Sequence, residues 1–337
     1  MPRQMPTMRD VALHAGVSIQ TVSCVINETG TISDETRHRV FQSIELLKYK
    51  RNPIARSMRT RQTRMIALLV MDITNPVLSV IASTVEAAAY ARGYNVLLYN
   101  TGLNAEREQA YLGSMSDSRA DGVIIVNAID PASALHLWNN YIPTVLIDCT
   151  APGDVPLVSI DNVEGGYLAT RHLIERGHQR IAHIAGSPTL EIVRQREAGY
   201  LRAIEEFGLA YRKTVPSHSL QWGYQIGYNA TKSLLHDTPR PTALFAASDE
   251  LAIGAYRALA EAGLCIPGDM SVVGFDNIEA AAFTTPPLTT IHQPFQELGE
   301  RAFSLLLNLL DGGEPDEPTG LLPPRLLIRE STAEAGA

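Results

Sequence analysis

The stretch TMRDVALHAGVSIQTVSCVIN, residues 7–27, predicts two short helices joined by a tight turn. Thr7 is suited to cap the first helix, with Asp10 as an acid in its first turn. Gly16 permits a sharp turn in which a residue with a β-carbon would be strained. Ser18 is suited to cap the second helix, whose valines recur at the spacing of one apolar face. This pattern indicates a helix-turn-helix, and the plainer alternative is an αα-hairpin with a polar outer face.

The outer face of the second predicted helix carries compact side chains that can enter a major groove and contact base edges or phosphates. These residues are Ile19, Gln20, Thr21, Ser23, Cys24 and Asn27. A third helix is predicted after Ser33, which would cap it. Residues 1–50 are therefore expected to form a small helical headpiece.

Charge is unevenly distributed along the chain. Residues 1–64 hold 11 Lys and Arg against 5 Asp and Glu, whereas the remaining residues hold 17 against 31. A basic segment on an acidic body predicts that the N-terminal part alone meets a polyanion such as DNA.

Length and composition indicate a multidomain globular protein. A chain of 337 residues is too long for one ordinary core, so two or three domains are expected. The three cysteines are scattered and form no metal-binding pattern, so neither disulfides nor a metal or other cofactor is expected. No apolar run resembles a signal peptide or a membrane span, which predicts a cytoplasmic protein.

Residues 51–63 read as a short basic segment that links the headpiece to the rest of the chain. Asn52 is suited to cap a helix in which Pro53 takes the first position. The helix would end near Arg59, too short to be stable alone in water. It is expected to need a partner, and an ordinary basic linker is the alternative.

From Met65 onward, apolar runs alternate with amphipathic segments, which is typical of α/β architecture. Two such series begin alike, with RMIALLV at 64–70 and RIAHIAG at 180–186. Two doubly wound parallel-sheet halves are therefore predicted, with a ligand cleft beyond the carboxyl ends of their strands.

Several long motifs in the same order make the chain resemble the lactose/galactose-repressor (LacI/GalR) family, in which the purine repressor is a recognisable relative. These are DVALHAGVSIQTVSCVIN (10–27), ETRHRVFQSIELLKYKRNPIARSMRT (35–60), DNVEGGYLATRHLIERGHQRIAHIAG (161–186), SDELAIGAYRAL (248–259), GFDN (274–277), PLTTIHQP (287–294) and RESTA (329–333). The resemblance implies a homodimer that binds a pseudo-palindromic operator, with a core like a periplasmic sugar-binding protein. It also implies interleaved boundaries: an N-subdomain of 64–161 and 294–322, a C-subdomain of 162–293 and 323–331, and a tail of 332–337.

The resemblance assigns roles to the DNA-contacting residues. Ile19, Gln20 and Cys24 match positions that read bases, where Gln20 can pair with adenine and Ile19 can contact a thymine methyl group. Cys24 stands where arginine or histidine is common in the family, so an arginine-type contact to guanine is absent. The residues expected to anchor phosphates are Thr7, Ser18, Thr21, Ser23 and Asn27.

The resemblance also makes the linker a hinge helix. Met58 matches the position of an apolar wedge that opens a base step in the minor groove, and Ala55 is small enough for two hinge helices to approach. Asn52 and Arg56 complete the expected contacts of this segment with DNA.

In the core, the resemblance implies that Arg196 and Asp276 bind a small effector and that Trp222 stacks on it. Asp72 and Asp148, at the ends of predicted strands, should line the opposite wall, although strand-end turn residues are the plainer alternative. Purine-binding relatives carry arginine and threonine where this sequence has Leu190 and Ile192. A sugar or sugar derivative is therefore expected rather than a purine.

Catalytic motifs are missing from the sequence. His172, His178 and His183 lack the spacing that places two metal ligands on one helical face, and no Walker loop, GxSxG elbow or GxGxxG is present. The prediction is a ligand-controlled transcriptional repressor rather than an enzyme. The alternatives are a solute-binding protein of a transport system and a sugar- or nucleotide-processing enzyme.

Overall fold

The computed structural model describes residues 6–50, 62–117, 120–314 and 319–336. Contacts group the chain into two compact units, Met1–Thr63 and Arg64–Ala337, here called the headpiece and the core. No helix among the described residues is long and apolar enough to cross a membrane.

The headpiece is helical, as predicted. Its helices are α1 (Met8–Ala15), α2 (Ile19–Asn27) and α3 (Asp34–Leu46). Thr7 and Asp10 form a capping box, in which the Asp10 carboxylate accepts from the Thr7 backbone N–H at 2.7 Å. Gly16 ends α1 with φ of +65°, a left-handed conformation that glycine adopts without strain. The sequence signals for the turn are thus the features that build it.

A small apolar cluster holds the three helices together. Val11, Val22 and Val40, one from each helix, are completely buried. Ser43 on α3 is also buried, and its hydroxyl lies 2.9 Å from His14 Nδ1 on α1. The apolar face of α2 is thereby turned inward, which leaves its other face on the surface.

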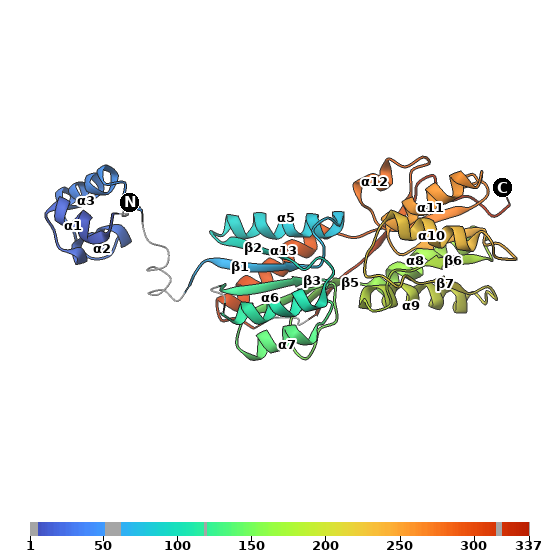
Figure 1. The fold of residues 1–337 in the computed structure, drawn as a ribbon, viewed down its shortest axis with the longest axis horizontal. Coiled ribbons are helices and arrows are strands. Elements are labelled where there is room, and N and C mark those ends of the chain that lie inside the picture. Colours follow the sequence, from blue (N-terminus) through green and yellow to red (C-terminus); the bar gives the residue numbers. More distant parts are fainter. Residues whose placement is uncertain (1–5, 51–61, 118–119, 315–318, 337) are drawn as a thin grey trace. The chain divides into compact units, whose positions relative to one another are not determined.

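The core contains two six-stranded sheets (Figure 1). The first sheet has the order β11-β5-β4-β3-β1-β2, and all of its pairings are parallel. Its strands are β1 (Met65–Val70), β2 (Asn95–Asn100), β3 (Gly122–Val126), β4 (Thr144–Ile147), β5 (Leu157–Ile160) and β11 (Thr319–Leu322). Its helices are α5 (Pro76–Ala91), α6 (Ala105–Asp117), α7 (Ala132–Asn139) and α13 (Phe295–Leu310).

The second sheet has the order β12-β10-β9-β8-β6-β7. Its strands are β6 (Ile181–Ile184), β7 (Lys213–Val215), β8 (Ala243–Ala246), β9 (Ser271–Asp276), β10 (Thr289–His292) and β12 (Arg325–Leu327). Only β12 runs antiparallel to its neighbour among the described strands. Its helices are α8 (Asn162–Glu175), α9 (Glu191–Glu206), α10 (Tyr224–Leu234), α11 (Asp249–Glu261) and α12 (Glu279–Ala282).

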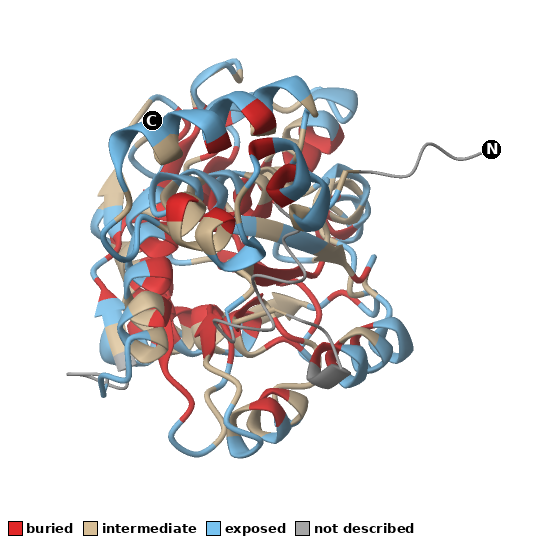
Figure 2. Ribbon diagram, turned by 90° about the vertical axis from the view of Figure 1, so that its left-hand side faces the viewer, coloured by how far each residue is buried: buried red, intermediate tan, exposed pale blue. Residues whose placement is uncertain are grey.

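Helices cover both faces of each sheet, so the central strands are buried on both sides, as Figure 2 shows by their red colour. β3, β4, β6, β8 and β9 are accordingly buried at every residue rather than at alternate ones. One apolar cluster runs through both halves of the core. The predicted pair of doubly wound α/β halves is therefore confirmed.

Five short elements were not predicted from the sequence: the strands β7, β10, β11 and β12 and the four-residue helix α12. Each has only three or four residues, too few for a periodic pattern to stand out. His178 follows Gly177 after the end of α8, and its side chain is buried. Its Nε2 lies 3.0 Å from the Ser271 hydroxyl and 3.2 Å from the Ala333 carbonyl, so it fastens the C-terminal segment to the sheet.

Glycine allows α8 and α9 to pack backbone against backbone. A β-carbon at Gly166 would overlap the carbonyl oxygen of Arg196, and one at Gly199 would overlap that of Val163. Gly227 and Gly254 do the same for α10 and α11. This close packing of α8 against α9 fixes the distance between Arg196, on α9, and the backbone of α8.

Gly166→Ala is expected to lower the free energy of unfolding by roughly 1–3 kcal/mol, because the added methyl group must push α8 away from α9. Gly113→Ala is the matched control, since Gly113 lies in α6 with nothing within 4 Å of an added β-carbon. The control should gain up to roughly 1 kcal/mol from the better helix propensity of alanine. Urea unfolding followed by circular dichroism measures both, and equal effects would contradict this account of the helix contact.

Candidate effector cleft and DNA-reading helix

A cleft in the core collects the carboxyl ends of strands from both sheets. The sheet order reverses between β1 and β3 and again between β6 and β8, which are the switch points where open α/β sheets bind ligands. The space free of protein atoms in and around the cleft is about 630 Å³, which includes open solvent at its mouth. All five residues predicted from the sequence line it: Asp72, Asp148, Arg196, Trp222 and Asp276.

Arg196, on α9, is the central cation of the cleft and is only 2% exposed. Its Nε donates to Asn162 Oδ1 at 2.8 Å, and its Nη1 donates to the Ala247 carbonyl at 2.6 Å. Its guanidinium carbon lies 3.7 Å from the centre of the Phe275 ring, in a cation–π contact. These contacts hold the guanidinium plane, and Nη2 has no hydrogen-bond partner among the described residues.

Asp276 ends β9 beside Arg196. Its Oδ1 accepts from Gln293 Nε2 at 2.6 Å and lies 3.5 Å from Arg196 Nη1. The carboxyl group is 6% exposed, and this burial raises its pKa to about 7, against the opposing pull of the Arg196 charge. The residue is held at φ of +117°, so the strand ends there in a strained turn.

Asp249, the first residue of α11, lies behind this pair and is completely buried. Its carboxylate accepts from the Thr290 hydroxyl at 2.5 Å and from the Ile278 backbone N–H at 2.9 Å. Burial, followed by the charge of Asp276, raises its pKa. Ser248 caps this helix, since its hydroxyl accepts from the Leu251 N–H.

The opposite wall carries Asp72 after β1 and Asp148 after β4. Asp148 is buried and accepts from the Ser159 hydroxyl at 2.7 Å through Oδ1, and burial raises its pKa. Asp72 is half-buried, and its Oδ1 accepts from the backbone and the hydroxyl of Thr74. Asp72 therefore makes the turn that the plainer interpretation required, and it also lines the cleft.

Trp222, between β7 and α10, stands near the guanidinium, with the Arg196 carbon 5.9 Å from its ring centre. The ring rests on Gly186, where a β-carbon would come within 3.0 Å of it. Trp222 therefore offers an aromatic face on the side of the second sheet.

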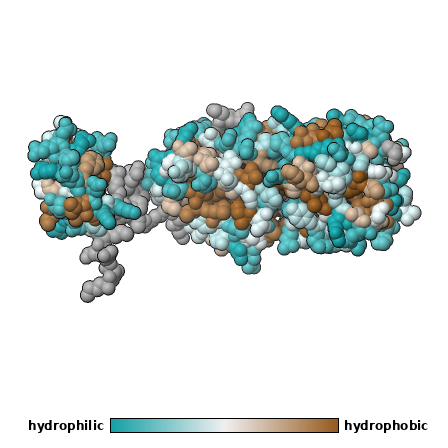
Figure 3. All heavy atoms as spheres, turned by 90° about the horizontal axis from the view of Figure 1, so that it is seen from above, coloured by the Kyte–Doolittle hydropathy of each residue, from teal (hydrophilic) through white to brown (hydrophobic). Residues whose placement is uncertain are grey.

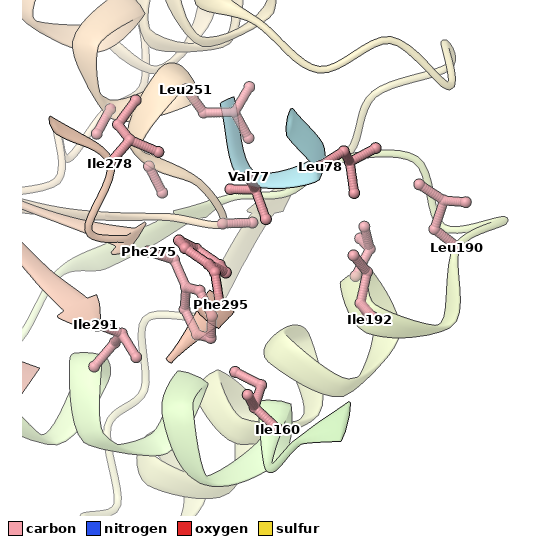
Figure 4. Close-up of a cluster of buried hydrophobic side chains, with 14 of the residues drawn as sticks. Val77, Leu78, Ile160, Leu190, Ile192, Leu251, Phe275, Ile278, Ile291 and Phe295 are labelled. Atoms are coloured by element: carbon pink, nitrogen blue, oxygen red, sulfur yellow. The ribbon is translucent and has the colours of Figure 1, made fainter. Parts of the chain in front are cut away.

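Apolar side chains complete the lining. Val77 and Leu78, at the start of α5, line the cleft together with Ile192, near the start of α9 (Figure 4). Leu190 is buried beside them and lines a smaller neighbouring pocket. The two residues singled out in the sequence, Leu190 and Ile192, thus supply apolar surface at or beside the cleft.

Sequence reasoning missed five polar lining residues: Thr74, which hydrogen-bonds to Asp72, and four others, Asn75, Asn127, Glu250 and Gln293. Asn75 Nδ2 donates to Glu250 Oε2 at 3.3 Å, which joins the start of α5 to the start of α11. Each of the four follows a strand or begins a helix, so strand-end position was the available signal. The short strand β10, which precedes Gln293, was itself not predicted.

In the headpiece, the outer face of α2 presents the predicted base-reading residues. Ile19 is 49% exposed and Gln20 is exposed, whereas Cys24 is half-buried. The predicted phosphate anchors also have local structural roles. The hydroxyls of Ser18 and Thr21 lie 2.9 Å apart, and Asn27 Nδ2 donates to the Ser23 carbonyl at 2.7 Å.

The predicted hinge contacts lie outside the described residues. These are Asn52, Ala55, Arg56 and Met58. Their roles stay predictions.

The headpiece and the core both match known proteins. Residues 7–52 match the model of bacterial regulatory proteins of the lacI family, and residues 170–332 match a periplasmic binding protein-like domain. The HTH-type transcriptional repressor PurR of Erwinia tasmaniensis is 39% identical over 340 residues, which cover 98% of each chain. The chain belongs to the LacI family.

Solved structures of two transcriptional regulators also resemble this chain. The lac repressor dimer bound to operator and the anti-inducer ONPF superposes with a TM-score of 0.88 at 29% identity, covering 98% of this chain and all of that one. A complex of the transcriptional regulator CelR with cellobiose gives 0.70 at 32% identity, over 97% and 99% of the two chains.

Membership of the LacI family settles the class of protein. The chain is a DNA-binding repressor with a helix-turn-helix headpiece and an effector-binding core of the periplasmic-binding-protein type. The family is not enzymatic, so the prediction that the chain is not an enzyme is confirmed.

Asp276→Asn is expected to flatten the pH dependence of core stability. The carboxyl pKa is about 7 in the folded chain and near 3.8 when unfolded, so the folded form holds the extra proton. Stability from this group is therefore lost as pH rises from about 4 to about 7. Asparagine cannot titrate, so the decline in stability between pH 4 and pH 8 should be smaller in the variant than in the native chain by roughly 1–4 kcal/mol. Loss of the pairing with Arg196 costs stability at every pH and leaves this difference in slope unchanged.

Thermal unfolding from pH 4 to 8 measures this effect. Asp154→Asn, at an exposed position outside the cleft, is the control and should follow the native profile. If the stability of Asp276→Asn falls with rising pH as steeply as that of the native chain, Asp276 is not the cause of the pH dependence.

Proposed function

We propose that the chain is a homodimeric repressor whose affinity for a pseudo-palindromic operator is controlled by a sugar or sugar derivative bound in the core cleft. The observation that carries the proposal is the buried Arg196–Asp276 pair, 3.5 Å apart, beside the aromatic ring of Trp222. A fixed donor, acidic acceptors and an aromatic face together suit a polyhydroxylated ring. Cellobiose in the similar CelR complex supports the same ligand class.

Ile192 bears on the choice between sugar and purine. Its apolar side chain lies at the cleft wall. The family resemblance places a threonine, which can hydrogen-bond, at this position in purine-binding relatives. A polar ring atom facing Ile192 would lose its partner on binding. This supports a sugar as the effector.

The proposed coupling between cleft and DNA rests on residues from both sheets. Asn75 and Glu250 already join α5 to α11 by a hydrogen bond, and a ligand must fit between these walls. Binding would favour one angle between the two halves over another. The resulting change in operator affinity is expected to be a coupling of roughly 1–3 kcal/mol.

The strand orders support the proposed subdomain boundaries. β11 joins the first sheet and β12 the second, while α13 packs on β3 and β4. We propose an N-subdomain of 64–161 and 294–322 and a C-subdomain of 162–293 and 323–331, so the chain crosses between them three times. Such crossings suit a hinged movement of one half against the other.

The proposed dimer is supported by apolar surface on the core, which Figure 3 shows in brown. β2 is an edge strand, and its Leu97 and Leu98 are 36% and 48% exposed. On neighbouring α5, Val80 and Tyr90 are also exposed. An unprotected apolar edge of this kind is favourable for a second copy to cover.

Gln20→Ala is expected to weaken operator binding by roughly 1–3 kcal/mol while leaving binding to unrelated DNA nearly unchanged, because a base contact specifies and a phosphate contact does not. The matched control is Gln42→Ala, on the exposed surface of α3. Fluorescence anisotropy at one salt concentration measures both, with an operator selected from random duplexes by the native protein. Equal losses on both kinds of DNA would exclude Gln20 from base reading.

Arg196→Lys is expected to abolish the response to a sugar effector while leaving operator binding in its absence. Lysine keeps the charge but cannot hold the planar fork that Asn162 and Ala247 position. A panel of sugars and nucleobases tested by thermal shift finds the effector, since a ligand of the folded state raises its melting temperature. Arg194→Lys, on the exposed side of α9, is the control.

An unchanged melting shift in Arg196→Lys would remove Arg196 from the site. A shift with nucleobases but with no sugar would overturn the proposed ligand class.

A further inference from the structure

We infer that the effector is an unphosphorylated, hydrogen-bond-donating sugar, and that the cleft rejects anionic ligands such as sugar phosphates. This inference rests on the proposed function and narrows it to one chemical class. It follows from the balance of acceptors and donors around the cleft rather than from any single residue.

Acceptors dominate the lining. Four carboxyl groups border the cleft, from Asp72 and Asp148 on one side and Glu250 and Asp276 on the other. Asp72 and Glu250 come from different sheets, and the charge of Asp72, after burial, contributes to raising the pKa of Glu250. In Asp148 and Asp276, the hydrogen bonds of the described residues go to Oδ1, which leaves Oδ2 for a ligand, as an acceptor in the ionised form.

A buried amide points to the same chemistry independently. Gln293 is 1% exposed, and its Nε2 is used by Asp276. Its Oε1 is buried with no hydrogen-bond partner among the described residues. The Oδ1 atom of Asn127, another lining residue, is likewise buried with no hydrogen-bond partner among the described residues. Buried acceptors without donors are costly, so a ligand O–H group that reaches either oxygen is favoured.

The positive charge of the cleft is mostly used. Arg196 is the one Lys or Arg among the lining residues that the structure describes. Its Nε and Nη1 already donate to the protein, which leaves Nη2. A phosphate carries a charge of about −1.5 to −2 and several strong acceptor oxygens. It would therefore meet one remaining donor group and several carboxyl groups.

Trp222 provides a test that needs no known ligand. The chain has two tryptophans, so Trp138→Phe leaves Trp222 as the sole reporter at the cleft. We expect caesium to quench it at least about threefold more efficiently than iodide, after each is normalised to free N-acetyltryptophanamide. Quenching by acrylamide, which is uncharged, measures how accessible the Trp222 ring is when charge plays no part.

Charge removal shows whether the cleft acids cause this preference. Adding Asp72→Asn and Glu250→Gln should bring the caesium-to-iodide ratio close to one. Glu106→Gln with Asp154→Asn, both at exposed positions outside the cleft lining, is the matched control and should leave it unchanged. Iodide quenching as efficient as that of caesium in the native cleft would overturn the inference.

Matched ligand pairs then separate this inference from the proposed function. Ribose, glucose and glucosamine are each titrated against their phosphates at the terminal hydroxyl, with hypoxanthine as the purine probe. A Kd at least about 100-fold lower for a free sugar than for its phosphate supports the inference. Tighter binding of a phosphate overturns it and leaves a sugar-controlled repressor standing, whereas binding of hypoxanthine alone overturns the sugar as effector. If none of the pairs binds, the quenching ratio decides.

Discussion

The burial of the Arg196 guanidinium is the constraint on which the core site depends. A buried cation must be paired and hydrogen-bonded, and here Asn162, the Ala247 carbonyl, Asp276 and the Phe275 ring supply what water would otherwise give. These partners come from α8, from the end of β8 and from β9. The arginine thus ties three elements together at the floor of the cleft, and a ligand meets a donor whose orientation is already fixed.

That arrangement needs unusually close helix packing. Arg196 reaches Asn162 because α8 and α9 touch through Gly166 and Gly199, and larger residues there would separate the two helices. The acids around the arginine are buried as well, and this burial raises the pKa of Asp148, Asp249 and Asp276. The cleft therefore stores unfavourable electrostatics that a suitable ligand can relieve, which is common where binding matters more than stability.

The headpiece follows a simpler logic. Three completely buried valines hold three short helices together, and capping groups satisfy the helix starts. Nothing more is needed to leave the outer face of α2 on the surface with Ile19 and Gln20 exposed. Because these features are local, the sequence predicted them closely. The long helices and central strands of the core were predicted for the same reason, since each carries its own period over many residues.

What the sequence alone determined was the class of protein: the helix-turn-helix, the basic headpiece, the two α/β halves and five residues that line the cleft. Tertiary structure decided which other groups meet them. Asn75 and Glu250, 175 positions apart in the sequence, are joined by a hydrogen bond. Gln293, which donates to Asp276, follows the strand β10, which is too short for its pattern to be recognised in the sequence. Such contacts depend on how two sheets present their strand ends to one space. Local sequence patterns do not predict that geometry, because it depends on residues far apart in the chain. Caps, turns and periodic helix faces depend on neighbouring residues and can therefore be predicted from the sequence.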